Sequence, residues 1–227
     1  MEITLTVPAE FIAVLKLFAA EKDVREYLNG IGVEIGATES RLVASNGAML
    51  GCFRVMSEQP EVTAPLTNIV IPNDLLKQIK PKGTVEITLG PLEAKTAGNG
   101  EEVPVSHSRP VSIAHAGVTL SGMTIDREAP NYRGVIPLRV SGQPGQFNPR
   151  LTGALAKAWA ILHGGKSTPC VGIGFNGEDP ALIDLNNDNF IGIFMPLRPK
   201  VVNAPVSAPP WCFDRLHGAT DSVQDLV

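Results

Sequence analysis

The first part of the chain changes from an alternating to a helical spacing of apolar residues. MEITLTV places an apolar side chain at every second position, which predicts a strand with one buried face. A helix is predicted over 8–20, because Pro8 suits a first turn and apolar residues follow at helical intervals: Phe11, Val14, Leu15 and Phe18. Strands are then predicted at 30–36, 41–45 and 49–55, with Asn46-Gly47 as the tight turn before the last.

The same order of strand, helix and three strands recurs in the next part of the chain. A strand at 68–72 precedes a short helix over 73–79, for which Asn73 is the expected N-cap. Further strands are predicted near 85–89, 92–98 and 118–125. Residues 98–116 contain Gly, Pro, Ser and His, and they are predicted to form a long loop.

A third unit starts after Pro137. A strand at 138–142 leads to a helix over 148–162, with Asn148 as its cap and an apolar stripe of Leu151, Leu155, Ala158 and Leu162. Strands at 170–175, 181–185 and 190–197 complete the unit, and a Pro-rich tail without periodicity follows. We therefore expect an α+β protein with a complete two-unit domain at 1–137, a half-domain at 138–200 and a flexible tail at 201–227.

Composition narrows the class of protein. The 227 residues are 44% hydrophobic and carry a net charge of −4, as expected of a folded globular chain that does not coat nucleic acid with its whole surface. Basic residues gathered on one face remain compatible with this charge. The sequence lacks a signal-peptide pattern and an apolar run near the length of a membrane span, so we expect a cytoplasmic protein without a membrane partner.

Short motifs for catalysis and cofactors are unconvincing. GGKST at 164–168 lacks the earlier glycine of a phosphate-binding loop, and GIGFNG at 172–177 and DLNNDN at 184–189 are more typical of turns. The histidines and the three cysteines, Cys52, Cys170 and Cys212, show no metal-ligand or disulfide spacing. We expect no cofactor, no metal and no catalytic residue; an enzyme with a dispersed site is the distant alternative.

Three segments resemble the bacterial DNA sliding clamp, the beta subunit of DNA polymerase III. DVREYLNG at 23–30 matches the family's D-x-R-x-Y-L-N-G, RLVASNGAMLG at 41–51 its V-A-T-D-G-H-R-L-A hairpin, and APNYRGVIP at 129–137 its F-P-D-Y-R-R-V-I-P. NFIGIFMPLRP at 189–199 is similar to the end of the family's third domain. Ala48 and Met49 replace the family's His-Arg pair, and the first domain and half of the third have no counterpart. The resemblance implies a shortened protein with the clamp fold, in which inner helices are covered by outer antiparallel sheets.

The resemblance also implies two binding surfaces. A pocket for partner peptides would comprise Arg25, Tyr27, Leu28, Gly47, Leu50, Pro130, Val135, Met195, Pro196, Leu197 and Arg198. Basic residues on and beside the helices would attract double-stranded DNA without reading its sequence: Lys16, Lys22, Lys77, Lys80, Lys82, Arg150 and Lys157. Ordinary core packing and a solvated helix face are the competing explanations.

The functional expectation is a non-enzymatic DNA processivity or recruitment factor that binds replication or repair proteins. The alternative is a reduced clamp relative that serves only as a peptide-binding adaptor or modulator and never encircles DNA. A homo-oligomer is expected, because the half-domain needs a partner to complete its sheet and open sheet edges need protection.

Overall fold

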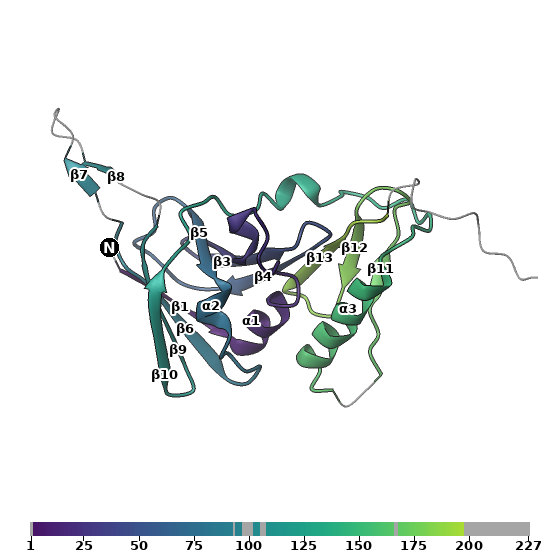
Figure 1. Ribbon diagram of the computed structural model, residues 1–227, viewed down its shortest axis with the longest axis horizontal. Coiled ribbons are helices and arrows are strands. Elements are labelled where there is room, and N and C mark those ends of the chain that lie inside the picture. Colours follow the sequence, from purple (N-terminus) through teal and green to yellow (C-terminus); the bar gives the residue numbers. More distant parts are fainter. Residues whose placement is uncertain (1, 93, 97–101, 105–107, 166–167, 198–227) are drawn as a thin grey trace, which may run out of the picture. The chain divides into compact units, whose positions relative to one another are not determined.

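The structure, a computed structural model, describes residues 2–92, 94–96, 102–104, 108–165 and 168–197. This part of the chain is built mostly of antiparallel strands, with three α-helices on one side of them (Figure 1). The predicted α+β class and the repeated units are confirmed. Among the described helices, none is long and apolar enough to cross a membrane.

The first unit follows the prediction closely. It comprises β1 (Ile3–Pro8), α1 (Ala9–Leu15), the short 3-10 helix η1 (Glu26–Leu28), β2 (Gly30–Ile35), β3 (Glu39–Ser45) and β4 (Met49–Met56). Helix α1 ends earlier than expected, because the backbone tightens after it: Leu17 N–H donates to Val14 O and Phe18 N–H to Leu15 O. Phe18 is still fully buried, so the apolar spacing marked the core correctly.

The second unit corrects two predictions. It comprises β5 (Leu66–Pro72), α2 (Asn73–Leu76), β6 (Thr84–Leu89), β7 (Ala94–Thr96), β8 (Glu102–Pro104), β9 (Pro110–His115) and β10 (Val118–Met123). The expected loop at 98–116 was wrong, because β9 pairs with β6 and β10 inside a sheet and buries Val111 and Ile113. Only two inward apolar residues mark this strand, which is too short a pattern to stand out between polar neighbours.

The short helix α2 also differs from its prediction. It ends at Leu76 instead of 79, so Lys77 is its C-cap and Lys80 lies beyond the helix. Pro81 disfavours helical geometry at the residue before it, which limits how far the helix can continue. Asn73 is not the N-cap: Pro72 holds that position, and the Asn73 amide donates to Ala20 O at 2.8 Å.

The third unit contains α3 (Pro149–Leu162), β11 (Gly172–Gly174), β12 (Ala181–Asp184) and β13 (Phe190–Phe194). The expected strand at 138–142 was wrong: Leu138 is fully exposed, and the segment makes isolated bonds such as Gly142 N–H to Phe175 O. The predicted cap of α3 is confirmed, because Asn148 Oδ1 accepts from Arg150 N–H at 3.0 Å.

The described strands form three sheets. Strands β1, β6, β9 and β10 form one, a larger one runs in the order β11-β12-β13-β4-β3-β2-β5, and β7 pairs with β8 in a two-stranded sheet. The antiparallel β13–β4 pair, with Ile193 opposite Leu50, joins the third unit to the first. The large sheet therefore continues across the expected domain boundary at 137, and residues 1–197 form one compact unit. The predicted tail at 201–227 lies outside the described residues.

The main core lies between the helices and the sheets. Phe11 of α1 stacks on Phe53 of β4 with ring centroids 4.0 Å apart, and Trp159 of α3 belongs to the same buried cluster. On the opposite face of the large sheet, a smaller cluster contains Val43, Leu50, Cys52, Tyr132 and Ile193. Burial of both faces of these strands is a major stabilising contribution, at roughly 25 cal/mol per Å² of apolar surface.

Candidate functional site

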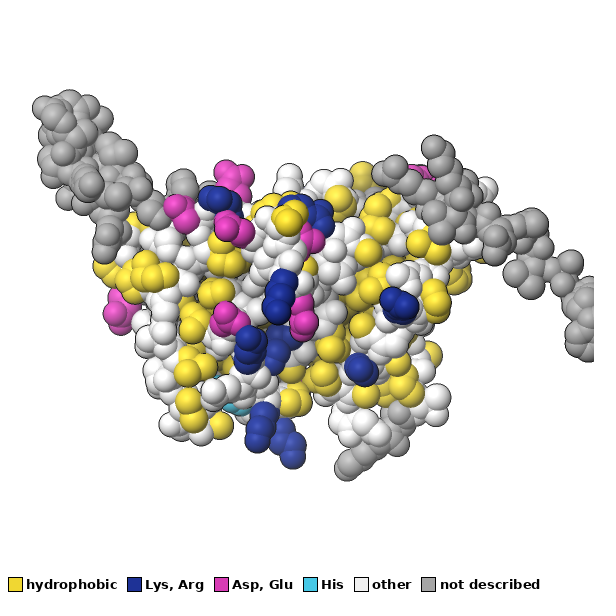
Figure 2. Space-filling view, viewed as in Figure 1, with side chains coloured by type: hydrophobic (Ala, Val, Ile, Leu, Met, Phe, Trp, Pro, Cys, Tyr) yellow, Lys and Arg dark blue, Asp and Glu magenta, His cyan; other side chains and the backbone are white. Residues whose placement is uncertain are grey.

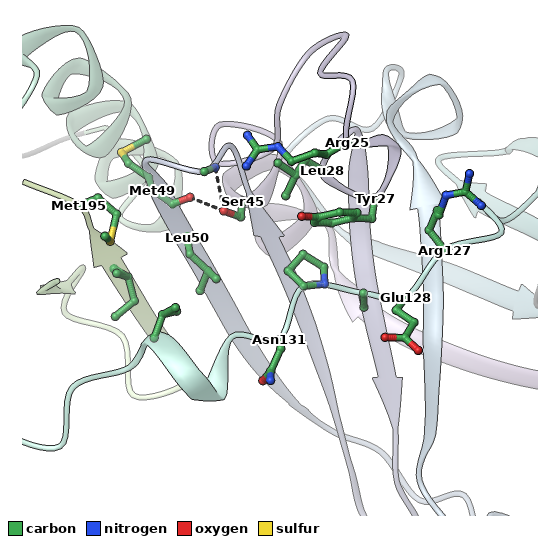
Figure 3. A pocket seen from close by; sticks show the side chains of 15 residues that line it. Arg25, Tyr27, Leu28, Ser45, Met49, Leu50, Arg127, Glu128, Asn131 and Met195 are labelled. Carbon is green, nitrogen blue, oxygen red and sulfur yellow. Dashed lines mark hydrogen bonds between the residues drawn. The ribbon is translucent and has the colours of Figure 1, made fainter.

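A pocket of about 590 Å³ opens where the β3–β4 turn meets η1, β13 and the segment 127–135. Eight of the residues expected from the sequence line it: Arg25, Tyr27, Leu28, Gly47, Leu50, Pro130, Val135 and Met195. Figure 3 shows Arg25, Tyr27 and Leu28 on one side, Met195 on the other, and Leu50 between them. Segments far apart in the sequence thus converge on one cavity.

Three expected residues are not brought into this pocket. Pro196 and Leu197 do not line it, and the Leu197 N–H instead donates to Gln146 O at 2.7 Å. Arg198 lies outside the described residues. Pro196 and Leu197 follow the end of β13, and the part of this segment that lines the cavity ends at Met195.

Seven lining residues were missed by the sequence reasoning: Ser45, Met49, Arg127, Glu128, Ala129, Asn131 and Ile193. Strand pairing could have indicated Ile193, which lies opposite Leu50 in register. The four residues near Pro130 belong to a segment without periodicity, so no pattern marked them.

A network of hydrogen bonds orders the loop that carries Arg25. Asp23 Oδ1 and Oδ2 accept from Arg25 Nε at 3.0 Å and Nη2 at 2.9 Å, and Asn29 exchanges two hydrogen bonds with the Asp23 backbone. The hydrogen bonds from Arg25 lower the pKa of Asp23 to about 2. The Arg25 side chain is thereby held over Gly47, where an added Cβ would lie 2.8 Å from Nη2.

The β3–β4 turn forms another part of the rim. Gly47 has a φ of 84°, which glycine adopts without strain, and Asn46 Oδ1 accepts from the N–H groups of Ala48 and Met49. The Ser45 hydroxyl donates to Met49 O at 2.9 Å, as drawn in Figure 3. The predicted Asn-Gly turn is confirmed, and it fixes the edge of the pocket.

The floor of the pocket is apolar and its rim carries charges. Leu28, Leu50 and Ile193 are buried, whereas Met195 and Val135 are about two-fifths exposed. Arg25, Arg127 and Glu128 supply polar groups at the border. This combination suits a ligand with an apolar anchor and a polar flank, such as a short peptide.

The basic residues expected from the sequence lie on or beside the helices. Figure 2 shows Lys and Arg side chains on the face that carries the helices, with acidic side chains among them. In α3, Arg150 and Lys157 are exposed and seven residues apart, so they share one face of the helix. Within the described residues, Lys22, Lys80, Lys82, Arg150 and Lys157 make no ion pair.

The remaining two cations are engaged within the protein. Lys77 pairs with Asp74 at 2.5 Å, and Lys16 Nζ donates to Lys77 O at 3.2 Å. Burial lowers the pKa of Lys16. Both lysines border a groove of about 710 Å³ that also contains Glu21, Asp74 and Asp126, so the charge along this groove is mixed.

Metal-binding and thiol chemistry are not indicated in the described residues. They contain no group of three or more His, Cys, Asp or Glu side chains arranged to hold a metal ion. Cys52 is buried and Cys170 exposed, both as free thiols. Burial raises the pKa of Cys52 to about 12, which keeps it protonated.

Comparison with known proteins identifies the fold. No family model and no curated protein matches the sequence. Solved structures match the fold: the Pseudomonas aeruginosa DNA polymerase sliding clamp, solved with a ligand, has a TM-score of 0.59 at 16% identity, over 86% of this chain and 66% of that one. The Thermotoga maritima beta subunit has a TM-score of 0.55 at 16% identity, over 86% and 65%, and the Caulobacter crescentus sliding clamp one of 0.56 at 17% identity, over 86% and 65%.

The chain spans about two thirds of the length of these clamps. The expected resemblance is therefore confirmed at the level of the fold: this chain has the fold of the bacterial sliding clamp, the beta subunit of DNA polymerase III.

Proposed function

We propose that this protein is a clamp-like recruitment or processivity factor without catalytic activity. Its pocket binds short peptide segments of replication or repair proteins, and basic residues on and beside its helices attract double-stranded DNA. The observation that supports this most directly is the pocket itself, where eight residues expected from the clamp resemblance come together.

The chemistry of the pocket supports a peptide as its ligand. Leu28, Leu50 and Ile193 offer an apolar floor for one large side chain, and Met49 and Met195 are flexible enough to fit different anchors. The Arg25 guanidinium at the rim suits an acidic residue next to the anchor. Ala48 and Met49, where clamps carry His-Arg, leave these two positions of the β3–β4 turn without a charge.

Peptide binding can be measured with a fluorescein-labelled segment of a replicative polymerase that carries a glutamine followed by an apolar anchor. We expect a Kd in the micromolar range, about −8 kcal/mol. Leu50→Ala and Met195→Ala each remove apolar contact and should weaken binding by about 1–3 kcal/mol.

Met56→Ala is the control, because Met56 is a methionine at the end of β4 that is 69% exposed and does not line the pocket. It should bind like the wild type in the same anisotropy titration. Unchanged affinity in both pocket variants would refute this site.

The basic face supports weak, sequence-independent attraction to DNA phosphates. Lys80, Lys82 and Lys157 are exposed and have no ion-pair partner among the described residues. Replacing each by Ala should make the negative slope of log K for DNA binding against log salt shallower by about 1. Arg54→Ala, on the sheet face opposite the helices, is the control and should leave the slope unchanged.

The second candidate is a peptide-binding adaptor that does not encircle DNA. The mixed charge of the groove beside α1 and α2 favours it. Asp74 neutralises Lys77 there, and Glu21 lies in the same groove. Retention on circular but not on linear DNA would support encirclement. Equal release from both, with peptide binding intact, would support the adaptor.

A further inference from the structure

One wall of the pocket is a segment without regular strands, which we call the strap and define as residues 127–135. In Figure 1 it is part of the teal segment that follows β10 and lies on the side of the large sheet away from the helices. Six of its residues line the pocket: Arg127, Glu128, Ala129, Pro130, Asn131 and Val135. The width of the pocket therefore depends on how firmly this segment is held.

The strap lies in direct contact with the sheet. A Cβ added at Gly32 of β2 would lie 2.9 Å from Ala129 Cβ and 3.5 Å from Pro130 Cδ. Tyr132 is only 4% exposed and packs in the cluster with Leu50, Cys52 and Ile193. Leu50 and Ile193 also line the pocket, so the packing of the strap continues into the pocket floor.

Glu34 of β2 makes the polar connection between sheet and strap. Its carboxylate accepts from Arg133 Nη1 and Nη2, both at 2.7 Å, and from the Tyr132 hydroxyl at 3.1 Å. The Arg133 guanidinium also lies 4.5 Å from the centre of the Tyr132 ring. The Glu34 side chain is 15% exposed and the Arg133 side chain 59%, so solvent reaches the guanidinium while the carboxylate is largely shielded.

The other ionic contact of the strap is weaker. Arg127 pairs with Glu26 at 3.2 Å, and both side chains are more than half exposed. Exposed pairs contribute little to stability because solvent and salt screen them. The bidentate pair with Glu34 is consequently the stronger of the two attachments.

We propose that Glu34 is a positioning residue for the pocket, which holds the strap on the sheet through Arg133 and Tyr132 although it does not line the cavity itself. The proposal rests on the proposed peptide-binding function. Without Glu34 the strap leaves the sheet for part of the time, and the apparent affinity falls with the fraction of molecules in which the wall is in place.

Cys52 offers a readout of the strap that does not depend on peptide binding. It is 3% exposed and packs in the cluster with Tyr132, so a thiol reagent reaches it only when the strap opens. Cys170→Ser and Cys212→Ser, made together, remove the other thiols of the chain. Labelling of this background by a chromogenic disulfide then follows Cys52 alone.

The experiment compares Glu34→Gln with Glu39→Gln in this background. Glu39 is the matched control, because it pairs with Arg41 within β3, the strand next to β2, and forms none of the hydrogen bonds or ion pairs that the described residues of the strap make. We expect Glu34→Gln to accelerate Cys52 labelling. It should also raise the peptide Kd by about threefold to tenfold, because fewer molecules have the strap in place to bind the peptide. Arg133→Lys, which keeps the charge and loses the bidentate geometry, should give a smaller change in the same direction.

Each outcome has a defined meaning. Faster labelling and weaker peptide binding in Glu34→Gln, with neither change in Glu39→Gln, supports the role of Glu34. An unchanged labelling rate, or faster labelling with unchanged peptide affinity, overturns it. If the wild type binds no peptide, the proposed function fails, while the labelling rates still decide whether Glu34 holds the strap.

Discussion

At the residue scale, glycines in β2 permit backbone contacts that are too close for a residue with a Cβ atom. A Cβ at Gly30 would lie 2.3 Å from the carbonyl oxygen of Ile71 in the paired strand β5. At Gly153, on the exposed side of α3, an added Cβ meets nothing within 4 Å. The same substitution should therefore have opposite effects at these two positions.

Gly30→Ala should destabilise the fold by about 1–3 kcal/mol, because the backbone of β5 must move to make space. Gly153→Ala should stabilise it by about 0.5–1 kcal/mol, since alanine favours the helix interior. Urea denaturation of both variants measures this. Two effects of the same sign would contradict the packing of β2 against β5.

Glu34 should also make stability depend on pH. Burial alone would raise its pKa, but the hydrogen bonds and charge of Arg133, with Tyr132 and Arg41, outweigh burial and lower it. A lowered pKa in the folded state stabilises the protein above the ordinary glutamate pKa, and this contribution disappears as the pH falls through the lowered value.

The difference in unfolding free energy between wild type and Glu34→Gln should therefore be larger at pH 7 than near pH 3. Urea denaturation over a pH series tests this, with Glu39→Gln as the control for a neighbouring carboxylate. A difference that stays constant with pH would show that the carboxylate charge of Glu34 does not contribute.

At the scale of elements, α3 carries its own start signal and packs on the core shared with α1. Asn148 caps it, Pro149 follows, and Leu155, Ala158 and Trp159 are buried. Since Arg150 and Lys157 project from this helix, its stability also bears on the proposed attraction of the protein to DNA.

Asn148→Ala should cost about 1 kcal/mol of unfolding free energy through loss of the cap, and Asn148→Gly only a few tenths. Thermal or urea unfolding measures both variants. Equal losses in the two would indicate that the cap hydrogen bond does not stabilise α3.

At the scale of the whole molecule, the open question is assembly. Strand β10 lies at the edge of its sheet, and Val118 and Met123 on it are about half exposed. An unpaired edge with exposed apolar residues favours pairing with another chain. We propose a homo-oligomer in which this edge pairs with another chain.

Light scattering coupled to size exclusion tests this prediction on the full chain. A mass of several chains that persists on dilution supports an oligomer, which a ring around DNA would require. A mass near 24.1 kDa at all concentrations would exclude a ring and favour the adaptor.

The sequence by itself determined the elements whose signals are local. Alternation predicted β1, the Asn46-Gly47 turn joined β3 to β4, and Asn148 with Pro149 started α3, because each signal acts within a few residues. The clamp resemblance indicated most of the pocket. Strand β9 was not predicted, because its burial depends on pairing with β6 and β10, which its own sequence does not specify.

Only the tertiary structure decided how the pocket is completed. Arg133 and Glu34 are 99 residues apart, and Ala129 reaches Gly32 across a similar separation. Neither contact leaves a periodic signal, because it forms only when β2 and the strap have been brought together by the folding of the whole sheet. The sequence thus specified the elements, whereas the three-dimensional packing of segments far apart in the chain specified the site.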